Sequence, residues 1–91
     1  MKLICPTIGE DEERDFLVTG TLDDFKIIVF SSMDEYEKGI RHLEVTDYKP
    51  CEVSMELFEE LSKKDDEFAG IILNLASENR FISKNEILEK L

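Results

Sequence analysis

One run of four apolar residues, 27–30 (Ile-Ile-Val-Phe), constrains the fold more than any other segment of this chain. Successive side chains of a strand point to opposite faces, so the run would place apolar groups on both faces. Such a strand is central in its sheet and covered on both sides. Residues 69–75, apolar except for Gly70 and Asn74, predict a second central strand.

Three segments carry the helix signals that would supply this cover. Ser32 followed by Glu35 fits a capping box, in which the hydroxyl accepts from a backbone N–H and the carboxylate returns to the cap amide. Ser83 and Glu86 repeat this spacing. Apolar residues recur at spacings of three and four in each segment. We therefore expect helices over residues 32–40, 54–64 and 83–91.

Prolines and one glycine suggest where elements end. Residues 2–5 predict a short strand that Pro6 would stop. Residues 42–48 alternate apolar and polar side chains, which predicts a strand with one wet face, ended by Pro50. Gly39 should weaken the last turn of the preceding helix and help to end it.

The remaining strands complete an α/β pattern. Residues 16–22 and 25–30 predict a β-hairpin around an Asp-Asp turn, and residues 80–82 predict a short edge strand. Alternation of strands and helices is typical of layered α/β folds. We expect a single small α/β domain over residues 1–91, with a mixed sheet of about five strands and three helices. Residues 1–15 would form its N-terminal strand and an acidic loop.

Charge narrows the class of partner. The 91 residues include 22 Asp and Glu against 11 Lys and Arg, for a net charge of -11. This excess disfavours direct binding to a nucleic-acid backbone or an anionic membrane and favours a basic protein partner. Apolar runs are too short to span a membrane, and the N-terminus lacks a signal-peptide pattern. We expect a cytoplasmic protein.

The two cysteines, Cys5 and Cys51, are too few for a disulfide scaffold and form no Cys-x-x-Cys motif. Two reduced, partly buried thiols are the first interpretation. A single bridge is the alternative, and it would require the two Cα atoms to lie within about 7 Å.

No motif for catalysis, a cofactor or a metal stands out. His42 is the single histidine, so any Ser-His or Cys-His arrangement would have to use it. There is no nucleophile elbow, no glycine-rich phosphate loop and no zinc motif. We expect a protein that is not an enzyme and needs no cofactor or metal.

Two acidic clusters are the candidate contacts for a basic partner. Neither has the ligand spacing of a calcium loop, so a solvated charge run and weak adventitious calcium binding are the alternatives. Their candidate residues are Glu10, Asp11, Glu12, Glu13, Asp15, Asp65, Asp66 and Glu67.

Asn74 is a further candidate, because it would lie at the C-terminal end of a central strand, where α/β domains place ligand contacts. The alternative is a turn residue whose side chain binds nearby backbone.

Three segments together resemble the N-terminal domain of the SseB family, named for enhanced serine sensitivity. The first is the apolar strand of residues 27–30 with the following Ser31, Ser32 and Glu35. The others are residues 48–58 (Tyr-Lys-Pro, then Val-Ser and Leu-Phe) and residues 70–74, followed by Ile82 and the last helix. The similarity covers roughly residues 16–91. Leu75 departs from the family, which usually has Pro there.

The resemblance implies a small α/β fold with a non-catalytic interaction role, and it transfers no catalytic residue. Members often continue beyond one such domain. The leading hypothesis is therefore an acidic interaction module, an adaptor or an immunity-type partner of a basic protein. Pairing of an edge strand, at residues 2–5 or 80–82, would allow a homodimer.

Two other classes stay open. An inhibitor that mimics nucleic acid would use carboxylates in place of phosphates, and it should show one face nearly free of basic residues. A small enzyme would have to build its site from His42 and nearby carboxylates.

Overall fold

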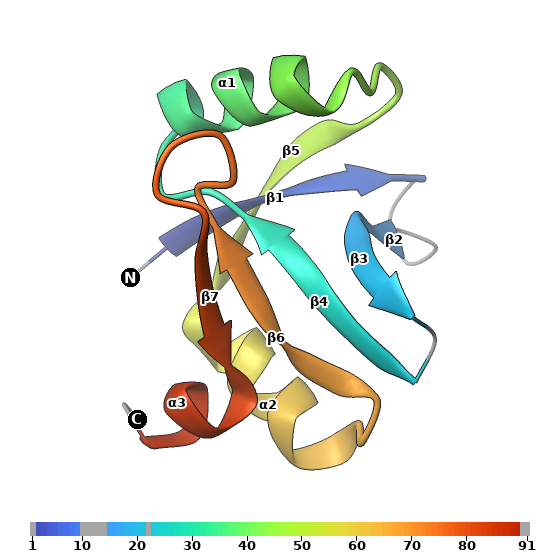
Figure 1. Cartoon of the computed structure of the whole chain (residues 1–91), viewed down its shortest axis with the longest axis vertical. Helices are drawn as coiled ribbons and strands as arrows, with labels where there is room; N and C mark the ends of the chain where they lie inside the picture. The colour runs from blue at the N-terminus through green and yellow to red at the C-terminus, as the bar shows by residue number, and fades with distance from the viewer. Residues whose placement is uncertain (1, 10–14, 22, 90–91) are drawn as a thin grey trace.

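The computed structural model describes residues 2–9, 15–21 and 23–89 (Figure 1). In chain order the elements are β1 (Lys2–Ile8), β2 (Asp15–Phe16), β3 (Val18–Thr21), β4 (Asp24–Val29), α1 (Met33–Leu43), β5 (Lys49–Ser54), α2 (Met55–Lys64), β6 (Phe68–Leu73), β7 (Arg80–Ser83) and α3 (Lys84–Glu89). The predicted small α/β class and the three helices are confirmed.

The strands of the described residues form two sheets, where the sequence suggested one of about five strands. One sheet has the order β2-β1-β5 and the other the order β3-β4-β6-β7. β4 and β6 run parallel, and the remaining pairs are antiparallel, so the second sheet is mixed. The sheets meet where Ile4 and Phe30 exchange two backbone hydrogen bonds of 2.8 Å.

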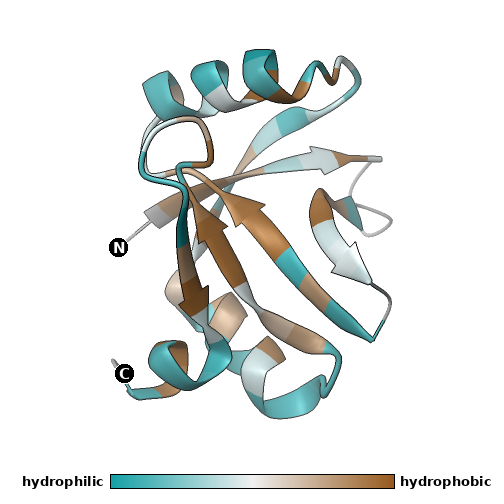
Figure 2. Cartoon of the chain, viewed as in Figure 1, coloured by the Kyte–Doolittle hydropathy of each residue, from teal (hydrophilic) through white to brown (hydrophobic). Residues whose placement is uncertain are grey.

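Both faces of β4 are covered, as its sequence predicts. Ile27 and Val29 point into a core with Phe58 of α2 and Ile87 of α3. On the opposite face, Ile28 and Phe30 pack with Tyr36 of α1. The hydropathy colouring shows apolar residues along β6 and towards the end of β4, and α1 as largely hydrophilic (Figure 2).

The strand predicted over residues 42–48 is wrong, because α1 continues through Leu43. The helix ends at Glu44, whose backbone is left-handed with φ 58° and whose N–H donates to the Ile40 carbonyl. Leu43 packs against the same cluster as Ile40, three residues earlier. Helical spacing therefore explains the apolar residues that suggested one face of a strand.

Gly39 lies inside α1 instead of ending it. It is buried against Phe30, and a Cβ at this position would overlap the Phe30 ring. Phe30 also meets Tyr36 edge to face, with 5.7 Å between ring centroids. The glycine thus lets the helix approach the sheet closely.

Both prolines lie within strands, so the expectation that they stop them is wrong. Pro6 of β1 stands opposite Pro50 of β5. The Pro6 carbonyl accepts from the Leu17 N–H at 3.0 Å, on the side away from β5. Backbone groups of one strand residue point to the same side, so the ladder with β5 does not need the missing Pro6 N–H.

The hairpin of β3 and β4 is confirmed, with Thr21 opposite Asp24, and β7 is an edge strand. The strand expected over residues 16–22 is divided at Leu17. This residue donates its N–H to Pro6 and accepts from Ile28 at its carbonyl, so it passes from one sheet to the other.

The two cysteines are thiols and stand directly opposite each other on β1 and β5. Cα atoms of opposite residues in an antiparallel pair are about 4.5–5.5 Å apart, so the distance condition for a bridge is met. Burial raises the pKa of the Cys5 thiol to about 12, and the neighbouring Cys51 adds to this shift. Cys51 is partly exposed.

We predict that Gly39→Ala destabilises the protein, although Ala is the better helix former. The propensity gain is about 1 kcal/mol, whereas overpacking a core costs typically about 1–3 kcal/mol. Urea unfolding should therefore show a net loss, and the Phe30 ring should shift in NMR spectra. The control is Lys38→Ala at the neighbouring exposed position, which should change stability by less than about 0.5 kcal/mol. A stabilised Gly39→Ala variant would show that the ring yields.

We predict that iodoacetamide at pH 8 modifies Cys51 much faster than Cys5, because the thiolate is the reactive form. Peptide mapping by mass spectrometry measures both rates, and a sample in denaturant should lose the difference. Burial raises the pKa of the Cys5 thiol from 9.0 to about 12, so the contribution of this thiol to stability is constant below pH 9. That contribution is lost as the pH rises from about 9 towards about 12. Equal labelling of the folded protein would contradict the burial.

Candidate functional site

An apolar groove opens between the β3–β4 hairpin and α2. It encloses about 790 Å³ and is open to solvent. It is lined by Asp15, Phe16, Val18, Gly20, Thr21, Phe25, Ile27, Leu57, Leu61 and Glu67. We refer to these ten residues as the groove.

Strand pairing and helical spacing bring its apolar residues to one surface. Val18 stands opposite Ile27 and Gly20 opposite Phe25, so all four lie on the same face of the sheet. Leu57 and Leu61 are four residues apart and share a face of α2. They pack against the core yet remain partly exposed, and Val18 is 47% exposed. The core is therefore continuous with an accessible apolar surface.

Two carboxylates stand at opposite ends of the groove. Asp15 precedes Val18 by three residues, at the start of the exposed edge. Glu67 accepts from the Phe25 N–H at its backbone carbonyl, at 3.0 Å, and Phe25 lies opposite Gly20. Asp15 and Gly20 are five residues apart in the sequence, so their Cα atoms are at most roughly 17 Å apart. Both acidic residues are exposed.

The structure brings together only part of the predicted acidic set. Asp15 and Glu67 belong to the groove, although they come from different clusters. Asp65 is partly buried and its Oδ1 accepts from the Glu67 N–H at 2.9 Å, which orders the loop after α2. Asp66 is exposed. The remaining candidates, Glu10, Asp11, Glu12 and Glu13, lie outside the described residues.

Asn74 is a structural junction in this fold. It is 2% exposed and has a left-handed backbone with φ 50°. Its Oδ1 accepts from the Ser31 N–H at 3.0 Å, while its Nδ2 donates to the Ser31 hydroxyl at 3.0 Å and to Glu78 at 3.2 Å. These bonds join the end of β4 to the loop between β6 and β7, so the geometry favours the turn interpretation of Asn74.

The start of α1 is attached to the same loop. Ser32 caps the helix by accepting from the Glu35 N–H at 3.2 Å. The Glu35 carboxylate accepts from the Ser77 hydroxyl at 2.6 Å, where the sequence suggested a return to the cap amide. These contacts hold the β6–β7 loop against α1 and leave the groove on the other side of the sheet.

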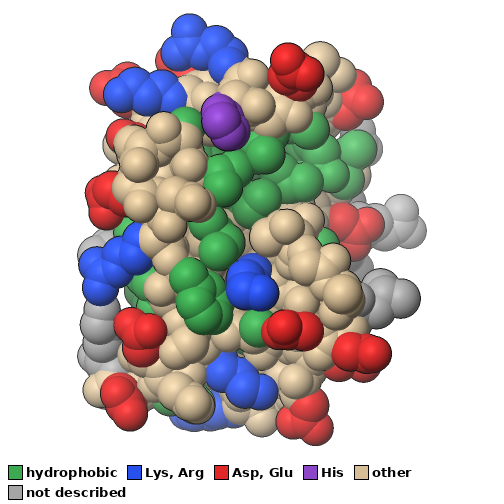
Figure 3. Space-filling view, viewed as in Figure 1, with side chains coloured by type: hydrophobic (Ala, Val, Ile, Leu, Met, Phe, Trp, Pro, Cys, Tyr) green, Lys and Arg blue, Asp and Glu red, His purple; other side chains and the backbone are tan. Residues whose placement is uncertain are grey.

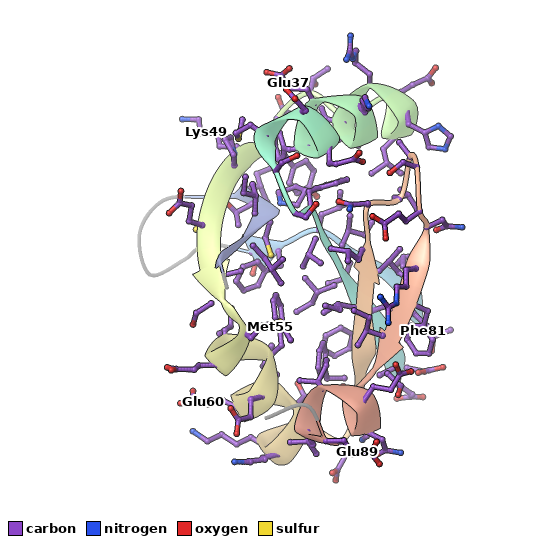
Figure 4. All side chains as sticks on the ribbon, turned by 90° about the vertical axis from the view of Figure 1, so that its left-hand side faces the viewer. Glu37, Lys49, Met55, Glu60, Phe81 and Glu89 are labelled. Atoms are coloured by element: carbon purple, nitrogen blue, oxygen red, sulfur yellow. The ribbon has the colours of Figure 1, made fainter. Side chains whose placement is uncertain are left out.

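Another exposed apolar side chain, Phe81, lies next to a basic residue. Phe81 of β7 is 44% exposed and points away from the molecule (Figure 4). The Lys26 ammonium lies 5.4 Å from the centroid of its ring. Lys26 would repel a basic partner, so charge favours the groove over this surface.

Within the described part of the chain, no group of three or more His, Cys, Asp or Glu residues could hold a metal ion. His42 is exposed near the end of α1, where Figure 3 shows it on the surface. No described helix is long and apolar enough to cross a membrane.

Sequence reasoning did not identify the apolar part of the groove. Leu57 and Leu61 were recognisable as the buried stripe of a helix, and Val18 as a strand residue. Nothing in their spacing indicates that the helix stops short of covering β3. That information lies in the tertiary packing alone.

We predict that Asn74→Ala lowers the free energy of unfolding by about 3 kcal/mol, from lost buried hydrogen bonds and the cost of a left-handed Ala. Asn79→Ala is a matched control, because Asn79 is also left-handed, with φ 45°, but exposed. It should lose only the backbone component, about 1 kcal/mol. Chemical denaturation of both variants measures the difference. Equal losses would remove the role assigned to the Asn74 side chain.

Comparison with protein families, curated proteins and solved structures found no match to this chain. The resemblance to the SseB family therefore stays a prediction, and the groove itself carries the functional argument.

Proposed function

We propose that this protein is a non-catalytic interaction module whose groove binds a basic segment of another protein. Its biological role would be that of an adaptor or an immunity-type partner. The observation that carries the proposal is an apolar groove with a carboxylate at each end, on a chain of net charge -11. The proposed setting is the cytoplasm, where thiols such as Cys5 stay reduced.

Apolar contact would supply most of the affinity. Burial of apolar surface contributes about 25 cal/mol per Å², and Val18, Leu57 and Leu61 offer such surface at the groove. Exposed ion pairs contribute only about 0–1 kcal/mol each. The acidic ends would instead steer a basic partner and select its orientation. Moderate salt should therefore slow association more than it weakens the bound complex.

The distribution of basic residues does not favour the nucleic-acid mimic. On the face shown in Figure 3, Lys and Arg side chains alternate with Asp and Glu around an apolar patch. On α2, Lys63 forms an ion pair of 3.2 Å with Glu59. A mimic of the phosphate backbone needs an uninterrupted acidic face.

A pair of charge reversals tests the groove as the binding surface. The double variant Asp15→Lys/Glu67→Lys should lower affinity for a basic partner about tenfold or more, by replacing attraction with repulsion at both ends. The partner is first recovered by tagged pull-down from nuclease-treated lysate, and affinity is then measured by calorimetry with purified proteins.

The matched control is Glu37→Lys/Glu60→Lys, which makes the same change in net charge. Both glutamates are exposed and point away from the core in Figure 4. Wild type and control should bind alike. Equal binding by all three proteins would reject the groove, and loss of the partner to competing DNA would revive the mimic.

A further inference from the structure

The outer edge of β3 runs along the groove. β3 is the first strand in the order β3-β4-β6-β7, so within the described residues only β4 pairs with it. β2 precedes β3 in the chain and belongs to the other sheet, and Leu17 between them passes from one sheet to the other. Unpaired edges offer backbone donors and acceptors to another strand.

The register shows which backbone groups point outward. The Ile28 N–H donates to the Leu17 carbonyl at 3.1 Å, which makes Leu17 and Ile28 a hydrogen-bonded pair. Such pairs alternate along an antiparallel ladder, so Thr19 and Thr21 direct their backbone groups towards β4. The N–H and C=O groups of Val18 and Gly20 therefore point away from β4, to the open side.

The same two residues place an added strand over the groove. Val18 and Gly20 line the groove, so side chains opposite them on a neighbouring strand would lie on the groove face as well. Gly20 has φ 106°, and a Cβ there would overlap the Asp24 carbonyl oxygen, so a glycine is required.

We propose that the partner segment binds as an extended strand, antiparallel to β3, with alternate apolar side chains in the groove and a basic residue at each end. This inference rests on the proposed function and specifies its ligand. Asp15 and Gly20 are at most roughly 17 Å apart, a span that five or six strand residues would cover. A basic residue at each end of a seven-residue segment would lie on the same face as the apolar residues between them, the face whose groove Asp15 and Glu67 line.

The probe is the peptide Lys-Thr-Val-Thr-Val-Thr-Arg, acetylated and amidated, at millimolar concentration. Lys, both Val and Arg share one face, and the three Thr share the other. Two control peptides separate the contributions. One carries N-methyl groups on both valines, which removes the donors facing β3 and keeps the side chains. The other has Glu at both ends.

Amide hydrogen exchange of the full chain, followed by NMR, provides the readout. In the free protein, Val18 and Gly20 should exchange quickly, and Thr19 and Thr21 slowly. Saturating peptide should slow exchange at Val18 and Gly20 about fivefold or more and leave Thr19 and Thr21 nearly unchanged. The N-methylated and acidic peptides should give no protection.

The outcomes separate this inference from the proposed function. Chemical-shift changes at Leu57 and Leu61 without protection of Val18 and Gly20 would overturn strand addition and leave the groove as a binding site. Equal binding of the N-methylated peptide, or no binding of the probe, would also overturn it. Concentration-dependent protection in the free protein would assign the edge to a second copy of this chain. Failure of the proposed function is detected by a separate experiment. In that case Asp15→Lys/Glu67→Lys would bind the partner as tightly as the wild type and the control variant do.

Discussion

Backbone hydrogen bonds between Ile4 and Phe30 determine how the two sheets are arranged, and the other elements depend on this junction. They hold β1 against the end of β4, and Figure 1 shows the two strands crossing there and then diverging. Leu17 makes the second connection, with its N–H on Pro6 of β1 and its carbonyl on Ile28 of β4. The two sheets diverge from these connections, and helix side chains pack against both faces of β4.

The three helices pack on different faces of the β4–β6 sheet. α2 and α3 supply Phe58 and Ile87 to the core beneath β4 and β6, and α1 closes the opposite face through Tyr36. Gly39 and Phe30 fix how closely α1 approaches, because only a glycine leaves room for the ring. No described helix covers the groove side of β3, so the core reaches the surface there. Apolar surface is therefore accessible at the groove, where Val18 is 47% exposed.

Charge and shape act at different stages of the proposed binding. The net charge of -11 would attract a basic protein from a distance, but it would not by itself select a site, since acidic side chains are spread over the face shown in Figure 3. Selection would come from the place where Asp15 and Glu67 flank an apolar surface and an open strand edge. Asn74 connects the end of β4 with the loop between β6 and β7 on the opposite side of the sheet.

The sequence by itself determined the local elements whose signals are short-range. The apolar run at residues 27–30 required cover on both faces, and Ser32 and Ser83 indicated helix starts, both of which the structure shows with hydroxyls accepting from the N–H groups of Glu35 and Glu86. Tertiary structure decided what depends on partners distant in sequence. Leu43 joined a helix because Phe30 and Tyr36 lay beneath it, and Pro6 stayed within a strand because its backbone faces Leu17 instead of β5. The groove belongs to this second class, because its two acidic residues come from segments 52 residues apart and line one groove only through the pairing of β3 with β4 and of Phe25 with Glu67.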